Sequence, residues 1–161
     1  MIRRINIGVL GCASIAERSV IPAILSLKEH FSLVAVASRS AEKAQLFAEK
    51  FSCEGIVGYE KVISRPDIDA IYIPLPTGLH DEWINRALEH GKHVYAEKSI
   101  AMRFSEAMVM IDNARRHNVA LMEGYMFQYH PQHREVKKML DDGIIGEIRH
   151  FSGAFGFPPL P

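Results

Sequence analysis

The sequence has few of the residues that mark secreted, metal-binding or membrane proteins. Its 161 residues include only two cysteines, Cys12 and Cys53. Two cysteines without C-x-x-C spacing do not make a disulfide scaffold, so we expect both thiols to be reduced. The longest apolar runs, such as residues 71–75, are too short to cross a bilayer. With no signal-peptide pattern at the start, these absences predict a cytoplasmic protein.

Excess charge of either sign is also absent. Nineteen Lys and Arg residues balance nineteen Asp and Glu residues, and no segment gathers a run of like charge. Nucleic acids and anionic membranes attract proteins through basic patches, so neither is expected as a partner. The 48% apolar content is enough for one buried domain and the start of another. The composition therefore favours a globular protein with a small-molecule partner.

Metal and nucleophile motifs are missing as well. His130 and His133 are three residues apart, but Pro131 places His130 at or before a helix start and no carboxylate completes a ligand set nearby. We therefore predict no metal site. No Ser-His-Asp or Cys-His pattern occurs, and the one thiol in an informative place is Cys12, where a helix N-terminus would lower its pKa.

The sequence does contain a regular alternation of short apolar runs and helix-periodic segments, which is typical of βαβ units in a parallel sheet. The predicted strands are residues 5–10, 33–37, 55–58, 70–74, 93–96 and 119–123. The predicted helices are residues 14–28, 41–51, 59–64, 77–90, 105–117 and 130–142, with Gly91, Asn118 and Gly143 as left-handed stops after the last three.

Right-handed crossovers between six such strands give a doubly wound Rossmann sheet of order 3-2-1-4-5-6. We predict this dinucleotide-binding domain over residues 1–123. Residues 124–161 are a surplus, with a connecting helix and an alternating pattern at 147–157 that predicts a strand. We interpret them as the start of a second α/β domain in a truncated chain.

The first predicted strand runs directly into a turn that opens the first helix. Gly11, Ala13 and Ala16 occupy the three places of the G-x-G-x-x-G/A fingerprint, with Cys12, Ser14 and Ile15 between them. Backbone N–H groups and the helix dipole attract a pyrophosphate at such a turn. The methyl group of Ala13 weakens the motif, and a compact packing turn is the alternative.

The second predicted strand ends at Ser38-Arg39-Ser40. NAD enzymes usually present Asp or Glu here to the ribose hydroxyls. Arg39 instead suits a 2′-phosphate, with Ser38 as a neutral donor and no carboxylate beside them. The pattern favours NADP, and a site that also accepts NAD is the alternative.

Ligands of open α/β sheets lie outside the carboxyl ends of the strands, so the loops after the third, fourth and fifth strands complete the predicted site. Leu75 and Pro76 form a stiff turn that we expect beneath the nicotinamide ribose. We expect Tyr59 near the adenosine, His80 at the ribose or nicotinamide amide, and Glu97 orienting the ammonium of its neighbour.

Several of these residues carry a family resemblance. Pro74 with His80 six residues on, then Gly91-Lys92-His93-Val94 and Glu97-Lys98, resemble the glucose-fructose oxidoreductase/inositol dehydrogenase (Gfo/Idh/MocA) family. Colinear matches are Gly11-Cys12-Ala13-Ser14, Ser38-Arg39, Asp67-Ile68-Asp69-Ala70 and Gly143-x-x-Gly146-Glu147-Ile148. Within the family, Ile73-Pro74-Leu75-Pro76 and Phe155-Gly156-Phe157-Pro158-Pro159-Leu160-Pro161 most resemble NADP-dependent 3-ketoreductases of nucleotide-linked deoxysugars.

The resemblance implies an oxidoreductase that transfers a hydride between NADP(H) and a sugar or nucleotide-sugar carbonyl. It implies that Lys98 is the catalytic residue, touching the nicotinamide ribose and the reacting oxygen. Ser99 stands where the family pattern Glu-Lys-Pro has proline. If relatives hold the bond after the lysine cis, the same geometry before serine costs about 2.5–4 kcal/mol. In that case we expect Lys98 to be displaced from the position it has in relatives. Relatives carry most substrate contacts and a dimer interface on the second domain, so the resemblance implies that this chain is inactive alone and that the full-length form is a homo-oligomer. A non-catalytic NAD(P)-binding module or sensor is the alternative.

Overall fold

A computed structural model describes residues 3–154 and residue 156. The chain divides into two compact units, Met1–Tyr125 and Met126–Pro161. No helix in the described part of the chain is long and apolar enough to cross a membrane. Nor do three His, Cys, Asp or Glu side chains come together among the described residues in a way that would hold a metal ion.

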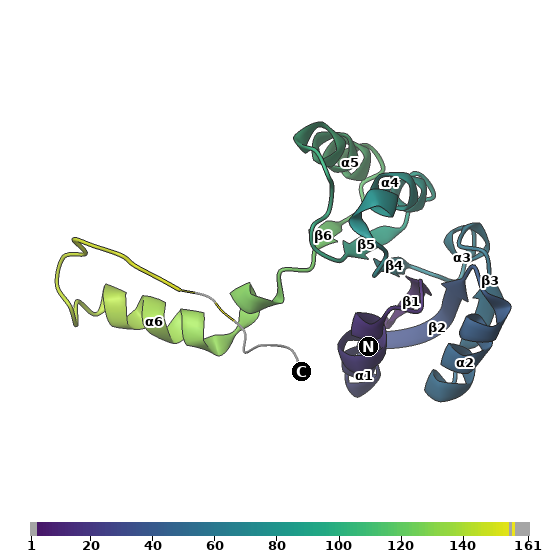
Figure 1. Ribbon diagram of the computed structural model, residues 1–161, viewed down its shortest axis with the longest axis horizontal. Helices are drawn as coiled ribbons and strands as arrows, with labels where there is room; N and C mark the ends of the chain where they lie inside the picture. Colours follow the sequence, from purple (N-terminus) through teal and green to yellow (C-terminus); the bar gives the residue numbers. More distant parts are fainter. Residues whose placement is uncertain (1–2, 155, 157–161) are drawn as a thin grey trace. The chain divides into compact units, whose positions relative to one another are not determined.

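The first unit is built on six parallel strands in the order β3-β2-β1-β4-β5-β6 (Figure 1). The strands are β1 Ile5–Leu10, β2 Phe31–Ser38, β3 Glu54–Val57, β4 Ala70–Ile73, β5 His93–Ala96 and β6 Leu121–Glu123. The predicted doubly wound order is therefore confirmed. Because the strand order reverses between β1 and β4, the connections that follow these two strands lead to opposite faces of the sheet and leave a crevice for a ligand outside their carboxyl ends.

Helices cover both faces of this sheet, because successive strand residues point to opposite sides. Ile7 and Val9 share one buried cluster with Ile21 and Ile24 of α1 and Phe51 of α2. The helices with their bounds are α1 Ile21–Ser26, α2 Ala41–Phe51, α3 Glu60–Ile63, α4 His80–Glu89 and α5 Phe104–Arg116. Figure 1 shows α1 and α2 together on one side of the sheet and α4 and α5 on the other.

The opposite face holds the larger cluster. Leu10 of β1 and Ile73 of β4 are buried there with Val62 of α3, Ile84 of α4 and Met110 of α5. All five side chains are essentially inaccessible to solvent. Both clusters lie directly behind the carboxyl ends of β1 and β4, so the loops at those ends extend from a rigid base.

Local signals explain most helix ends. Ser40 caps α2 by accepting a hydrogen bond from the Lys43 backbone N–H, at 3.3 Å. Gly91 and Asn118 take positive φ angles of 71° and 52° after α4 and α5, as predicted. The first helix begins at Ser14, passes through a π-helical turn at Ala16–Val20 and ends at Ser26, two residues before the predicted end.

The second unit contains a short 3-10 helix η3, Met126–Tyr129, and helix α6, Pro131–Asp141. His130 is the N-cap of α6 and accepts from the Gln132 N–H at 3.2 Å, so it has a local structural role. The strand predicted over residues 147–157 is wrong where it is described, since residues 147–154 form no strand. A strand needs a neighbour for its backbone groups, and β-like alternation does not supply one. Phe155 and residues 157–161 lie outside the described residues.

Candidate functional site

A cavity of about 260 Å³ lies at the carboxyl ends of β1, β2 and β4. It is lined by Gly11, Cys12, Ala13, Ser38, Arg39, Ser40, Lys43, Tyr59, Pro74, Leu75 and Pro76. Three segments that are distant in sequence, the turn after β1, the end of β2 and the loop after β4, thus form one concave surface. This is the place where α/β sheets of this order bind their ligands.

The turn after β1 requires glycine at its first fingerprint position. Gly11 has a φ of +114°, and a Cβ built there would lie 2.8 Å from Cδ2 of Leu75 across the cavity wall. Its N–H donates to the Ala37 carbonyl at 2.8 Å, which fixes the turn to β2. Ala13 tolerates a side chain and still lines the cavity. The backbone therefore approaches the cavity at Gly11 and Ala13, as phosphate binding needs.

The remaining turn residues act by packing or face elsewhere. Ala16 is fully buried against the sheet, which suits the third fingerprint position, where helix and strand approach closely. Ser14 is exposed and Ile15 is partly exposed. None of these three residues lines the cavity.

The end of β2 presents hydroxyl and cationic groups to the cavity. Ser38 is 6% exposed, and its Oγ accepts from the Ser40 N–H at 3.1 Å. Arg39 is exposed and lines the cavity, while the Ser40 cap places Lys43 in the first turn of α2, where it also lines the cavity. None of the described residues that line it carries a carboxylate. Lys43 was missed from the sequence, although a capping serine three residues earlier is a signal for its position.

Cys12 links this turn to α2. Its thiol donates to the Lys43 carbonyl at 3.4 Å. Burial raises the pKa of the Cys12 thiol, against smaller opposing effects of a hydrogen bond with Ser38 and the charge of Lys43. The expected lowering of this pKa is therefore wrong, because lost hydration outweighs the favourable helix position.

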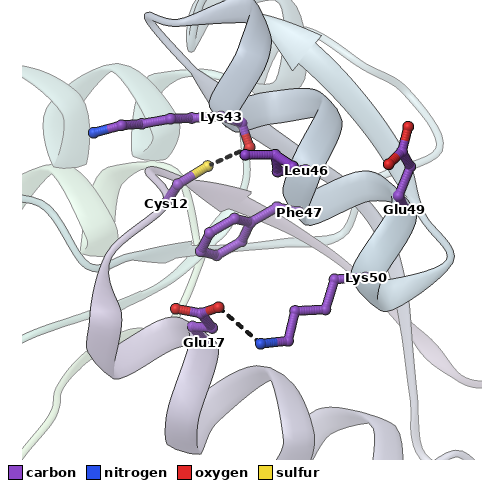
Figure 2. Close-up of a pocket in the computed structure, with 7 residues that line it drawn as sticks. All are labelled: Cys12, Glu17, Lys43, Leu46, Phe47, Glu49 and Lys50. Atoms are coloured by element: carbon purple, nitrogen blue, oxygen red, sulfur yellow. Dashed lines mark hydrogen bonds and ion pairs between the residues drawn. The ribbon is translucent and has the colours of Figure 1, made fainter.

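A second cavity, of about 580 Å³, lies on the other side of the Cys12–Lys43 contact. Figure 2 shows Phe47 between Cys12 and the Glu17–Lys50 ion pair, whose two charged atoms are 2.8 Å apart. The Lys43 ammonium points away from this pair in the same view. The cavity is a crevice between the first helix and α2. Apart from the Glu17–Lys50 ion pair, the charged residues that line it are Lys43 and the exposed Glu49.

The loop after β4 forms the far wall of the first cavity. Leu75 and Pro76 line it beside Tyr59, whose ring is 7% exposed. Tyr59 packs edge-on against Trp83 of α4, with ring centroids 5.0 Å apart. The wall is therefore stiff and largely apolar, with the Tyr59 ring fixed from behind.

Lys98 lies in the turn after β5, the strand next to β4. Its side chain is exposed, and within residues 3–154 and 156 no hydrogen bond or ion pair is formed by its ammonium. The Lys98–Ser99 peptide bond is cis. Lys98 does not itself line the 260 Å³ cavity. The structure thus presents a free amine at the same edge of the sheet.

Glu97 does not orient this amine, contrary to the prediction. Its side chain is 8% exposed and accepts a hydrogen bond from the Tyr72 hydroxyl at 2.9 Å. Glu97 is buried and Lys98 is exposed, so the two neighbouring side chains lie in different surroundings. Burial, and then the Glu97 carboxylate, raise the pKa of Tyr72.

His80 is also placed differently from the prediction. It is completely buried, and both ring nitrogens lie within hydrogen-bonding distance of backbone carbonyls. No ring nitrogen is left for a ribose or an amide. The sequence placed His80 near the site correctly, but its contacts are with the protein.

The family model for "Oxidoreductase family, NAD-binding Rossmann fold" (GFO_IDH_MocA) matches residues 5–125. The chain is 48% identical over 161 residues to dTDP-3,4-didehydro-2,6-dideoxy-alpha-D-glucose 3-reductase of Saccharopolyspora spinosa, covering 100% of this chain and 48% of the relative. It is 47% identical over 157 residues to the enzyme of that name from Actinomadura kijaniata, covering 98% and 47%. The chain therefore spans about half the length of these curated relatives.

Solved structures agree. The 3-ketoreductase KijD10 of Actinomadura kijaniata, in complex with NADP and TDP-benzene, superposes with a TM-score of 0.86 at 46% identity, covering 91% of this chain and 45% of that one. Scyllo-inositol dehydrogenase of Lactobacillus casei, with NAD(H) and scyllo-inositol, gives a TM-score of 0.80 at 26% identity, covering 90% and 43%. With its matching model, strand order and cavity, the chain belongs to the GFO_IDH_MocA oxidoreductase family with an NAD-binding Rossmann fold.

Proposed function

We propose that this chain is the cofactor-binding part of an NADP-dependent oxidoreductase that transfers a hydride to or from a sugar carbon of a nucleotide-linked sugar. The observation that carries the cofactor proposal is the cavity end formed by Ser38, Arg39 and Lys43, which has cations and a hydroxyl but no carboxylate. These groups suit a phosphate dianion, because the cations attract its negative charge and there is no carboxylate in the set to repel it. Relatives of the same family support the choice, since KijD10 was solved with NADP.

The residues present fit this cofactor. At Gly11 the turn is tight enough that a Cβ would meet Leu75, and the first helix begins directly after it, so the N–H groups at the helix start would suit a pyrophosphate. Arg39 and Lys43 would hold a 2′-phosphate, and Tyr59 would pack beside the adenosine. The bound cofactor supplies the hydride chemistry, while the chain binds and orients it.

Lys98 is the proposed proton donor. Its ammonium is exposed and unpaired within the described residues, so it is free to donate a hydrogen bond or proton to a carbonyl oxygen that gains negative charge during reduction. A free amine at the mouth of the sheet is what a catalytic module needs and a sensor does not, so this observation favours the enzyme.

We place the nucleotide-sugar contacts, and an acid/base group that would complement Lys98, on a further α/β domain to which residues 124–161 would belong. Two observations support this. The chain spans 48% of its Saccharopolyspora relative, whose name specifies a dTDP-linked keto sugar. In addition, α6 has no buried residue, so its apolar side chains would need a further packing surface to be buried.

The cofactor proposal is tested by titrating the 161-residue chain with NADPH and with NADH, following nicotinamide fluorescence. We expect NADPH to bind at least tenfold more tightly. Arg39→Ala and Lys43→Ala should each reduce that preference, whereas Arg18→Ala, an exposed arginine on the first helix outside the cavity lining, should not. Equal affinities for the two cofactors would overturn the proposal.

A further inference from the structure

His80 joins the two loops of the site through a single side chain. It is the first residue of α4, and its Nε2 lies 2.8 Å from the Leu75 carbonyl, in the cavity wall. Its Nδ1 lies 3.0 Å from the Ser99 carbonyl and 3.1 Å from the Ile100 carbonyl, in the turn that follows Lys98. One imidazole therefore lies against both the loop after β4 and the turn after β5. Carbonyl oxygens only accept, so a neutral ring donates to one of the two segments and contacts the other, and it donates to both only in its protonated form.

The ring lies where little else connects these loops. The two strands are paired as far as Ile73 and Ala96, and the Glu97 N–H still donates to the Ile73 carbonyl at 3.0 Å. Beyond that point the two segments leave the ladder. The completely buried ring of His80 then takes over the connection, in a setting where its hydrogen bonds do not compete with water.

A second group holds the same turn from the other side. Oε1 of Glu123, the last residue of β6, accepts from the Ile100 N–H at 2.8 Å. The turn backbone is thus bound at its carbonyls by His80 and at its N–H by Glu123, while the Lys98 side chain projects freely. A fixed backbone limits the region that the Lys98 ammonium can reach, which is one step toward preorganising a proton donor.

We propose that His80 is a positioning residue. Its imidazole fixes the Ser99–Ile100 backbone against the Leu75 carbonyl, and so sets the place of the Lys98 ammonium relative to the cofactor cavity. This inference rests on the proposed role of Lys98. It assigns to His80 no contact with substrate or cofactor, because the ring has no exposed atom.

The test uses His80→Phe, which keeps an aromatic ring but removes both nitrogens, and His80→Asn, whose amide can still donate toward the Ser99 and Ile100 carbonyls. In the full-length enzyme we expect His80→Phe to lower kcat at least tenfold while the Michaelis constant for the sugar changes less than threefold. His80→Asn should recover most of the loss. His90→Gln is the matched control, since His90 lies at the other end of α4 and is 40% exposed.

A second measurement does not depend on activity. Hydrogen exchange of the Ile100 amide in the 161-residue chain should accelerate at least tenfold in His80→Phe, with the amides of β1 unchanged and NADPH affinity altered less than threefold. A global rise in exchange would mean that the ring is only part of the core and would overturn the inference. Unchanged kcat in folded His80→Phe would also overturn it. If Lys98→Ala retains full kcat while Ile100 exchange responds as expected, the role of Lys98 fails and the His80 contact alone stands.

Discussion

Two turns at the same edge of the sheet are built in different ways. The turn after β1 is shaped by its own backbone: Gly11 takes a φ of +114°, and the helix that follows begins at Ser14. The turn after β5 is held by side chains from elsewhere, His80 and Glu123. An anion can be bound by backbone N–H groups, so its cradle is encoded locally. The Lys98 ammonium, in contrast, needs a defined position relative to the cofactor cavity, and the backbone that carries it is held by residues of other elements.

The largest effect should come from removing the amine itself. In the full-length enzyme, Lys98→Ala should lower kcat by about 10²–10⁴-fold, the usual contribution of a positioned proton donor. NADPH affinity of the 161-residue chain should stay within threefold, because Lys98 does not line the cavity. Lys61→Ala, at an exposed lysine on α3, is the control and should leave both quantities unchanged. A loss of NADPH binding equal to the loss of kcat would contradict the division between the two turns.

Disturbing the backbone turn should affect binding first. Gly11→Ala introduces a side chain at positive φ and a contact with Leu75, so unfolding free energy should fall by about 1–3 kcal/mol and NADPH affinity at least tenfold. Urea unfolding and fluorescence titration measure the two effects. Gly58→Ala is the matched control, since Gly58 has a φ of +97° with nothing within 4 Å of a built Cβ. It should share the strain but keep the affinity; equal affinity loss in both variants would show that strain alone is responsible.

A smaller effect is expected beneath the lysine turn. Tyr72→Phe removes the hydroxyl that donates to the Glu97 carboxylate, whose side chain is 8% exposed. Leaving a buried acceptor without its donor should cost about 1–3 kcal/mol of unfolding free energy. Tyr129→Phe, at a tyrosine that is 62% exposed, should cost nothing measurable. An unchanged urea midpoint for Tyr72→Phe would show that Glu97 needs no support from Tyr72.

The thiols should have the smallest effect on cofactor binding and turnover, and their prediction concerns chemical reactivity alone. Burial raises the pKa of Cys53 from 9.0 to about 11 and also raises the pKa of Cys12. Since the thiolate is the nucleophile, alkylation of Cys53 at pH 8 should be about 100-fold slower in the folded chain than in urea, with the gap closing as pH rises through 11. Because the folded pKa is raised, this thiol contributes stability below pH 9 that is lost as pH rises through 11.

Peptide mapping by mass spectrometry separates the two cysteines. Cys12 should also alkylate more slowly than in the unfolded chain, despite its place before a helix. Faster alkylation of Cys12 in the folded chain would show that the turn after β1 activates a side chain as well as binding with its backbone.

The sequence alone determined the secondary structure and topology of the first unit. Short apolar runs, some alternating with polar residues and some continuous, are separated by segments with helical periodicity, and this pattern specifies parallel strands. Their order follows because right-handed crossovers leave few alternatives. It also brought Gly11, Ser38, Arg39, Tyr59 and Leu75 to one cavity, since each follows a strand end. The same reasoning failed at residues 147–154, where alternation was present but no neighbouring strand was.

Only the tertiary structure decided what the side chains of the lysine turn contact. Sequence position placed His80 and Glu97 near the site, and both turned inward, to backbone carbonyls and to Tyr72. The sequence did not predict Lys43 as a site residue, because Lys43 reaches the cavity only through the packing of α2 beside the turn after β1. The physical reason is range. Backbone conformation depends on neighbours in the chain, whereas the direction and partners of a polar side chain depend on which groups the folded sheet brings to it.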